Sequence, residues 1–368
     1  MTFENYKNKH MNQQKKPLAP FTSQFSPEVP EILYNLRCTI AISTYQAGKV
    51  VFLSAPKPDK LVQIARTFEG AMGVAVKDNK MAVACKSDLH ILANTPSMAK
   101  TYPPKQNIYD ALYMPRSTFY TGQLSLHDLN WIDNHLISVN TLFSCLSKID
   151  DNYSFTPVWK PKFISELAPE DRCHLNGMAM QGNDIKYVTA LGETNSRGGW
   201  RENKLKGGII IDVNSNEIIV QNLAMPHSPR IYNNKLYALL SAAGELIEID
   251  INKGTYETIT KFDYFLRGMD KIGDYIFIGH SKLRHTTSAF KDLPIAKKSQ
   301  KAGVIIVHLP TGSIVGNIIY ENSVDEIYDV KILPNMTRPN IINPQHASVN
   351  LAVTTPEDSY WAVSNESK

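Results

Sequence analysis

The stretch SPRIYNNKLYALLSAAGELIEIDINKGTYETITKF, residues 228–262, decides the fold class of this chain. It holds four short runs of apolar and β-branched residues, and the turn signal Asn233-Asn234 separates the first two. Four short strands in about 35 residues match the size of one blade of a β-propeller. The stretch therefore predicts a repeated, all-β architecture.

Comparable units recur along the rest of the chain, each with turn signals such as Asp133-Asn134 or Gly273-Asp274 between its strands. Strands spaced by roughly 8–12 residues are typical of sandwiches, barrels and propellers. No amphipathic helix of convincing length competes with them. Further units cover residues 126–159, 176–223 and 267–321, and another begins at Met72 with an unclear last strand.

The two ends of the chain complete the count. Residues 37–68 hold three strands, and the last strand, 326–334, resembles the first strand of a blade without followers. Pairing the last strand with the first three closes the ring and removes an exposed sheet edge. We therefore predict a six-bladed β-propeller over residues 31–334, with tails at 1–30 and 335–368. A seventh blade within residues 94–125 is the main structural alternative.

Composition excludes several classes of protein. Among the 368 residues, 43% are hydrophobic and 20% charged, which is ordinary for a globular protein. The net charge of +4 is too weak to indicate a nucleic-acid partner, and part of it lies in the expected N-terminal tail. The N-terminus has no apolar signal-peptide core, and no apolar run reaches 18 residues, so we expect a cytoplasmic protein without a membrane partner.

The four cysteines form no C-x-x-C pair and occur in strand-like, apolar surroundings. We expect them to be reduced thiols in the core. They are Cys38, Cys85, Cys145 and Cys173.

Strand alternation predicts which face of the propeller carries the chemistry. We call the face at which the innermost strands begin the upper face; the loop between the second and third strands of a blade returns to it. Long insertions are expected on that side, and long loops on a rigid scaffold are where binding concentrates. These insertions are residues 94–125, 160–175, 192–207 and 282–302.

Three histidines, His127, His174 and His227, occupy comparable positions at the starts of innermost strands. Imidazoles converging on the channel suit a divalent transition metal, with Asn176 and Asp329 completing the ligand set. They equally suit metal-free acid–base catalysis near neutral pH, in which Arg230 would join the three histidines as a catalytic residue. No tight metal-binding spacing decides between the two readings.

Cationic and aromatic side chains accompany the histidines on the upper face. Arginine binds carboxylates and phosphates through paired hydrogen bonds, so these residues predict a small anionic or sugar-like ligand. The alternatives are that the charges are ordinary solvated loop residues and that Tyr45-Gln46 only forms a hairpin turn. The predicted substrate-binding residues are Tyr45, Gln46, Trp200, Arg201, Arg267, Lys282 and Arg284.

Several motifs together resemble one family. They are STYQAGKVV (43–51), RCHLNGMAM (172–180), GGWRENKLKGG (198–208), HSPRIYNNKLYAL (227–239), FLRGMD (265–270), SKLR with FKDLPI (281–295) and EIYDVKILPNMTRP (326–339). The resemblance is to an uncharacterised bacterial family of conserved hypothetical proteins, tagged as a domain of unknown function, and it spans about residues 20–340. It implies no activity, because none is established for that family.

At the level of fold the chain is similar to the gluconolactonase-like and strictosidine synthase-like six-bladed propellers. That similarity implies a divalent metal in the channel, held there by Glu, Asn and Asp. Here His174, Asn176, His227 and Asp329 form a more histidine-rich set, which disfavours a calcium lactonase site.

Three hypotheses for function follow, because a propeller fold by itself does not fix function. The first is an enzyme, a metal-dependent lyase, isomerase or hydrolase, acting on a small anionic or sugar-like molecule. No Gly-x-Ser-x-Gly motif supports a serine nucleophile. The second is a protein that binds such a ligand without chemistry. The third is a scaffold for a protein partner.

Overall fold

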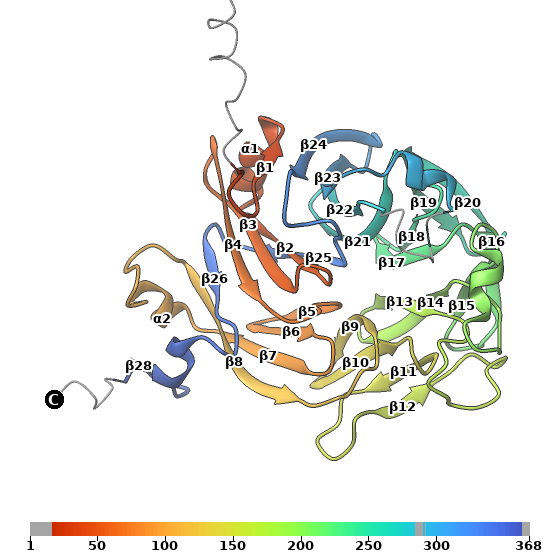
Figure 1. Cartoon of the computed structure of the whole chain (residues 1–368), viewed down its shortest axis with the longest axis horizontal. Helices are drawn as coiled ribbons and strands as arrows, with labels where there is room; N and C mark the ends of the chain where they lie inside the picture. Colours follow the sequence, from red (N-terminus) through yellow and green to blue (C-terminus); the bar gives the residue numbers. More distant parts are fainter. Residues whose placement is uncertain (1–16, 284–289, 291, 363–368) are drawn as a thin grey trace, which may run out of the picture.

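The computed structural model describes residues 17–283, 290 and 292–362. Six sheets stand side by side around a central axis, and the chain passes through them in sequence order (Figure 1). Each sheet is one blade whose four successive strands are antiparallel neighbours. The predicted six-bladed β-propeller is thus confirmed.

The first blade joins both ends of the ring. The C-terminal strand β25 pairs with β2 along six consecutive residues, from Cys38 opposite Pro334 to Ser43 opposite Asp329. The predicted closure of the ring is therefore present. Blade 1 consists of β25 (Asp329–Pro334), β2 (Cys38–Thr44), β3 (Lys49–Lys57) and β4 (Lys60–Thr67).

The other five blades follow in chain order, each from its innermost strand outward. Blade 2 holds β5 (Val74–Lys77), β6 (Lys80–Ala84), β7 (Leu89–Asn94) and β8 (Ala111–Phe119), and blade 3 holds β9 (Leu126–Ile132), β10 (His135–Asn140), β11 (Cys145–Lys148) and β12 (Thr156–Trp159). Blade 4 holds β13 (Leu175–Gln181), β14 (Asp184–Ala190), β15 (Gly208–Asp212) and β16 (Ile218–Leu223). Blade 5 holds β17 (Pro226–Tyr232), β18 (Lys235–Leu240), β19 (Glu245–Asp250) and β20 (Thr255–Lys261), and blade 6 holds β21 (Phe265–Ile272), β22 (Tyr275–Ser281), β23 (Ala302–His308) and β24 (Ser313–Tyr320).

Burial along the strands follows from their position in a blade. Strand β2, with sequence CTIAIST, is buried at every residue because neighbouring blades cover both of its faces. The outermost strand β20, TYETITK, is exposed over its first four residues. Six hydrophobic clusters fill the six gaps between successive blades, so the core is a ring of interfaces between sheets.

Blade 2 corrects one expectation about the insertions. The last strand that the sequence left unclear is β8, which pairs with β7. Residues 95–110, including helix α2 (Pro96–Lys100), therefore connect a third strand to a fourth and return to the face opposite the upper one. Only residues 120–125 of this insertion lead into an innermost strand. Among the described residues, no further propeller sheet lies in 94–125.

Segments outside 31–334 also take part in the fold. Strand β1 (Ser23–Phe25) pairs with β24, and helix α1 (Glu28–Leu36) packs its buried face, with Val29 and Leu33, on the interface between blades 6 and 1. At the other end, β26 (Pro339–Ile341) adds to β8 in parallel. The folded region thus extends beyond the expected tail boundaries at both ends.

The residues that follow β26 lie on blade 2. Met98 and Tyr102 of the α2 region form a small cluster with Ile342, and Trp361 packs against it. The remaining elements there are a 3₁₀ turn, η4 (Ala347–Leu351), and a hairpin of β27 (Ala352–Thr354) and β28 (Ser359–Trp361). Among the described residues no helix is both long and apolar enough to span a bilayer.

Hydroxyl side chains at the upper ends of second strands join neighbouring blades. Each donates a hydrogen bond to a backbone carbonyl at the start of the next blade, as Thr141 does to Leu175 and Ser241 to Leu266. Ser43 and Ser281 make the same contact with Met72 and Ile327. These bonds lie at the upper end of the channel. They therefore hold the first residues of the innermost strands in place, in the region where the predicted histidines lie.

Candidate functional site

A pocket of about 250 Å³ opens at the upper mouth of the channel. The three predicted histidines line it, together with Tyr45, Arg267 and residues that the sequence analysis did not assign to the site: Met72, Ser125, Leu191, Met225, Phe265, Phe290, Glu326 and Tyr328. A second hollow of about 350 Å³ shares Tyr45, Phe265, Arg267, Phe290 and Glu326 with it and adds Gln46 and Lys282. The two hollows therefore form one recess.

His127 and His227 are held by the same local arrangement. Each is the second residue of an innermost strand and follows by two positions a residue with left-handed backbone, Ser125 or Met225. In each ring Nδ1 lies 3.1 Å from that residue's carbonyl oxygen. A carbonyl only accepts hydrogen bonds, so Nδ1 carries the proton in both rings.

A hydroxyl also contacts each Nδ1, at 2.8 Å: Thr141 for His127 and Ser241 for His227. Each hydroxyl donates its own proton to the next blade, so it accepts from the imidazole. The unprotonated Nε2 is therefore the atom that each ring offers to the pocket. Among the described residues it has no hydrogen-bond partner.

Both imidazoles are neutral at physiological pH. Burial, followed by the positive charge of Arg267, holds the pKa of His127 well below its ordinary value of 6.5. The same two causes, in the same order, lower the pKa of His227. A neutral imidazole with a protonated Nδ1 presents a hydrogen-bond acceptor, so the pocket offers two fixed acceptors to a ligand.

His174 is held differently, by a carboxylate. Its Nδ1 lies 2.8 Å from Oδ1 of Asp171, and the other oxygen of Asp171 accepts hydrogen bonds from the indole of Trp200 and the guanidinium of Arg201. The ring packs against Trp200 with 4.4 Å between centroids and edge-on against His127 at 4.8 Å. This carboxylate orients His174 as a base would be oriented in a catalytic dyad.

The predicted lid residues serve mainly to position His174. Trp200 lies in the 3₁₀ turn η2 (Gly199–Asn203) and is buried in a cluster that also includes Phe265, Leu283 and Ile295, the last from η3 (Pro294–Lys297). Arg201 stacks on Trp200 at 4.3 Å and pairs with Asp171. Neither residue lines the recess itself. The predicted Arg284 lies outside the described residues.

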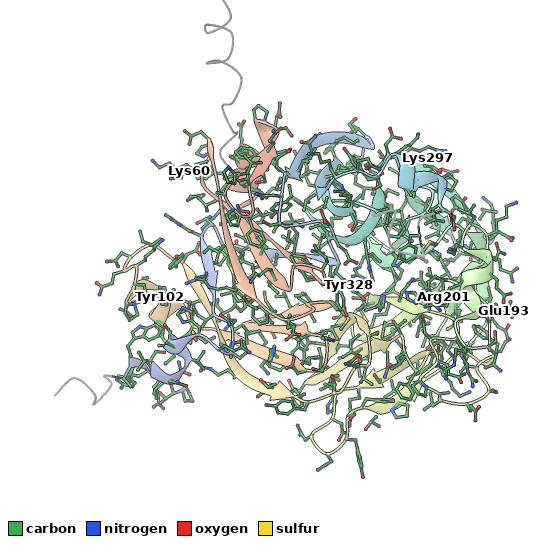
Figure 2. The ribbon with its side chains drawn as sticks, viewed as in Figure 1. Lys60, Tyr102, Glu193, Arg201, Lys297 and Tyr328 are labelled. Atoms are coloured by element: carbon green, nitrogen blue, oxygen red, sulfur yellow. The ribbon has the colours of Figure 1, made fainter. Side chains whose placement is uncertain are left out.

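The cations at the mouth are paired. Arg267 forms an ion pair of 3.0 Å with Glu326 and stacks on the ring of Tyr328 at 3.6 Å, near the centre of the ring of blades (Figure 2). Lys282 lies 4.0 Å from Asp325. The recess therefore combines aromatic walls with compensated charges rather than an excess of positive charge.

Two further predicted residues, Arg230 and Asp329, lie in the channel below the pocket. Arg230 donates to Asp128 at 2.7 Å and lies 4.0 Å from Asp329, while Lys331 approaches both carboxylates. Burial lowers the pKa of Arg230, but the negative charges of Asp128 and Asp329 raise it by more, so the net effect is a raised pKa. These residues form a buried ionic cluster. Arg230 therefore binds carboxylates below the pocket and does not line the pocket in which it was predicted to act.

The predicted metal ligands do not converge. Asn176 donates to Pro226 and accepts from Thr189, and the oxygens of Asp329 accept the backbone N–H groups of Val74 and Val330. These atoms hold neighbouring strands together, and metal binding would break those contacts. Among the described residues, His127, His174 and His227 also belong to no group of three whose ligand atoms lie within 4.8 Å of one another. The recess therefore does not fit the expected metal.

A larger cavity, of about 620 Å³, lies away from the channel between blades 5 and 6. Ala242, Phe262, Ile295, Ile305 and Ile314 contribute to its walls. Among its described lining residues it has one imidazole, that of His280, and so it does not present the matched pair of imidazole acceptors found at the upper mouth. Volume alone therefore does not identify the functional site in this molecule.

Comparison with known proteins supports the propeller fold and indicates no function. The model of a family described as a domain of unknown function, DUF4915, matches residues 27–342. The chain belongs to this family. That span covers every blade of the propeller and the whole recess at its upper mouth, so this DUF4915 protein carries its candidate site within the family domain.

The nidogen/laminin match below is a likeness of fold alone. A chain from the crystal structure of a nidogen/laminin complex aligns over 81% of this chain and 99% of its own length, with a TM-score of 0.50 and 8% identity. The WD40 domain of Pan2 from Neurospora crassa aligns over 67% of this chain and 64% of its own, with a TM-score of 0.38 and 13% identity. No curated protein matches the sequence.

Buried histidines predict acid sensitivity of the fold. His280 on β22 is fully buried, and burial lowers its pKa to about 4, although its contact with the carbonyl of Lys301 opposes the shift. Between pH 6.5 and 4, His280 is protonated in the unfolded chain but neutral in the native state. The free energy of unfolding therefore decreases as pH falls through this range. His280 alone accounts for about 3 kcal/mol between pH 6.5 and 4, at about 1.4 kcal/mol per unit.

We expect His280→Asn to flatten the pH dependence of stability over this window. Urea unfolding of the natural protein and the variant at several pH values between 7.5 and 4.5 measures the difference. Equal slopes for the two proteins would show that His280 does not titrate with a lowered pKa.

Proposed function

We propose that this protein binds a small, neutral, sugar-like molecule in the recess at the upper mouth of its channel. The observation that carries the proposal is the matched pair of neutral imidazoles, His127 and His227, whose Nε2 atoms are unpaired acceptors. Adjacent hydroxyl groups of a sugar are donors of the kind that these acceptors need.

The walls of the recess support the same class of ligand. Tyr45, Phe265, Phe290 and Tyr328 line it. Aromatic rings supply large apolar surfaces, and a few placed polar groups then orient the ligand. The predicted anionic ligand has less support, because Arg201, Arg267 and Lys282 each lie beside a carboxylate.

Binding of D-glucose, D-galactose and their uronic acids, measured by calorimetry and by the midpoint of thermal unfolding, tests the proposal. We expect a neutral sugar to bind more tightly than its uronate. His127→Asn and His227→Asn should each weaken binding about tenfold, since the ligand loses one hydrogen bond to the protein. Asparagine places its amide nitrogen near the position of Nδ1, so the contact with the backbone carbonyl is kept while Nε2 is removed.

His280→Asn is the matched control, because it removes a buried imidazole whose Nδ1 also contacts a carbonyl but which lies outside the recess. It should leave sugar affinity unchanged. Failure of every sugar to bind would refute the proposal, and binding of uronates alone would restore the anionic ligand in its place.

A second function, catalysis on the bound sugar, is favoured by the contact between His174 and Asp171. In this arrangement Nδ1 of His174 donates to the carboxylate, and Nε2 can accept a proton from a water molecule that attacks the carbonyl of a bound sugar lactone; the ring C–O bond breaks and the ring oxygen takes up the proton. Sugar lactones incubated with the protein in the same experiments provide the test. Ring opening that Asp171→Asn slows about 100-fold would support catalysis, whereas unchanged lactones would leave binding alone.

A further inference from the structure

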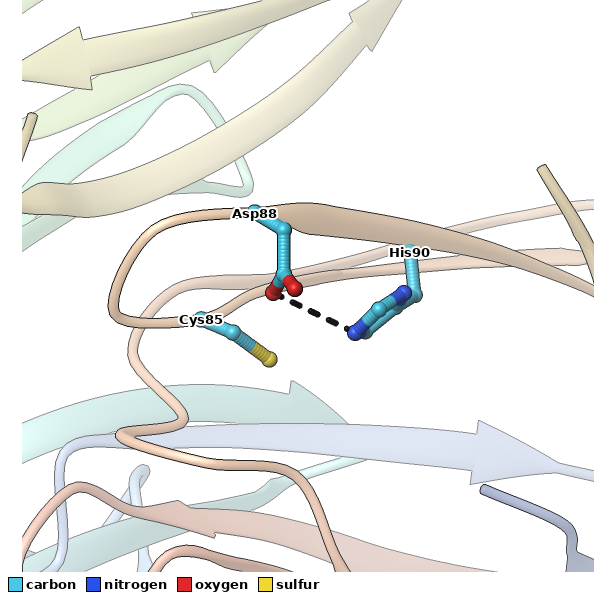
Figure 3. A group of neighbouring side chains, drawn as sticks. All are labelled: Cys85, Asp88 and His90. Carbon is cyan, nitrogen blue, oxygen red and sulfur yellow. Dashed lines mark ion pairs between the residues drawn. The ribbon is translucent and has the colours of Figure 1, made fainter. Parts of the chain in front are cut away.

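A second cluster of potential ligands lies in blade 2, apart from the recess. Cys85, Asp88 and His90 follow one another across the loop that joins β6 to β7 on the upper face (Figure 3). Their sulfur, oxygen and nitrogen ligand atoms all lie within 4.8 Å of one another, the single such group among the described residues. Cys85 and His90 are 3% and 5% exposed, while Asp88 reaches solvent.

The loop is rigidly held. The backbone N–H of Cys85 donates to the carbonyl of Asp88 at 2.8 Å, and the N–H of Lys86 donates to Glu69. Strands β6 and β7 keep continuous pairing up to Ala84 and Leu89, so the three side chains start from fixed positions. A site of this kind needs little reorganisation to bind an ion.

His90 is oriented for coordination. Its Nδ1 contacts the hydroxyl of Thr118 on the neighbouring strand β8 at 3.0 Å, which directs Nε2 towards Asp88 and Cys85. Metal-bound histidines are usually held in this way through their second nitrogen. Nε2 of His90 lies 3.3 Å from Oδ1 of Asp88. Nitrogen and oxygen ligands on one tetrahedral zinc ion are about 3.3 Å apart, given bonds of about 2.0–2.1 Å.

The electrostatics of the cluster also favour a cation. The charges that act on the thiol of Cys85 are those of Asp88 and Glu69, both negative. Among the described residues, neither carboxylate has a lysine or arginine partner. Two carboxylates beside the thiol give the cluster a negative potential that a divalent cation would balance.

We propose that Cys85, Asp88 and His90 bind one zinc ion. Zinc accepts sulfur, nitrogen and carboxylate ligands together, whereas calcium and magnesium require oxygen. On binding, a Zn–S bond forms and the thiol proton leaves to solvent. Water supplies the fourth ligand from the exposed side of Asp88. The ion would fasten the β6–β7 loop of blade 2 at the upper face.

Cobalt(II) is the probe that tests this site, since a cobalt–thiolate bond produces a charge-transfer absorption in the near ultraviolet. Full-length protein stripped with a chelator should bind one equivalent of cobalt(II) with this band, and zinc(II) should displace it. Cys85→Ala should abolish the band. Cys38→Ala, which removes an equally buried thiol from another interface, should keep it. Thr118→Val should weaken zinc affinity about 10–100-fold with the band intact.

If Cys85→Ala does not fold, Asp88→Asn provides the test, because Asp88 is partly exposed and its replacement leaves the core intact. Asp88→Asn should lower the affinity for zinc. Asp78→Asn, in the turn at the other end of β6, is the control and should leave the affinity unchanged. Absence of the band in the natural protein would overturn the proposal. So would a band that persists in Cys85→Ala, or bound zinc that is lost in His174→Ala and kept in Cys85→Ala.

Discussion

Arg230→Met is expected to destabilise the propeller by about 3–5 kcal/mol, because it leaves two buried carboxylates with Lys331 as their single cationic neighbour among the described residues. Arg230 lies 2.7 Å from Asp128 and 4.0 Å from Asp329, deep in the channel. Methionine fills a similar volume and removes the charge, so the loss reports on the ionic contact rather than on a cavity. Urea unfolding near pH 7 measures it.

A surface ion pair serves as the control. Lys162 and Glu217 are also in contact, but their side chains are 52% and 62% exposed. Lys162→Met should cost at most about 1 kcal/mol. The double variant Arg230→Met with Asp128→Asn should recover part of the loss. Similar costs at Arg230 and Lys162 would show that the channel cluster contributes little to stability.

Gly268→Ala is expected to cost about 2–5 kcal/mol, from two separate causes. Gly268 on β21 has φ of +77°, a conformation that is unfavourable for alanine by roughly 1–2 kcal/mol. A Cβ atom there would also lie 2.7 Å from the backbone nitrogen of Val330 on β25. That strand closes the ring and is paired along its length, so it cannot move aside without further loss of about 1–3 kcal/mol.

Gly122→Ala separates the two causes. Gly122 has φ of +73° but nothing within 4 Å of its virtual Cβ. This control should therefore show the backbone strain alone, and thermal or urea unfolding of both variants gives the contribution of the clash by difference. Equal destabilisation at both positions would mean that β25 accommodates the methyl group.

The architecture was accessible from the sequence because each blade repeats a local pattern. Turn pairs such as Asn233-Asn234 and the unpaired strand at 326–334 were enough to predict the blades and the closure. Strand β8 was not predicted, because the segment that contains α2 separates it from β7 and interrupts the usual spacing between successive strands. Strands β1 and β26 are three residues long and owe their pairing to the neighbouring sheets, a tertiary effect that no local pattern reveals.

The site was accessible only in part. Positions near strand starts identified all three histidines, but only His127 and His227 are equivalent, each as the second residue of an innermost strand. The predicted equivalence is wrong for His174, which precedes its strand, has a left-handed backbone like Ser125 and Met225, and reaches the same pocket from that different position. The sequence could not show that Arg230 and Asp329 turn into an ionic cluster, since that depends on charges from other blades. Asp171, three residues before His174, was missed, although that spacing was a readable signal.

The buried thiols illustrate the same limit. All four cysteines are free and buried, as expected for core residues. Among the described cysteines, only Cys85 has its sulfur within 4.8 Å of the ligand atoms of both a histidine and a carboxylate. The tight β6–β7 loop brings these atoms together, and no familiar cysteine spacing indicates it. The pattern C-x-x-D-x-H across a hairpin was the available signal.

The closure of the ring by β25 has a consequence for synthesis on the ribosome. Ser43 of β2 and its partner Asp329 of β25 are 286 positions apart in the chain. The sheet of blade 1 is therefore incomplete until β25 has been synthesised. At about 5–20 residues per second the nascent chain keeps this edge unpaired for roughly 15–60 s. During that interval an apolar strand is open to pairing with other nascent chains, so truncated translation products that lack β25 should be the most dependent on chaperones.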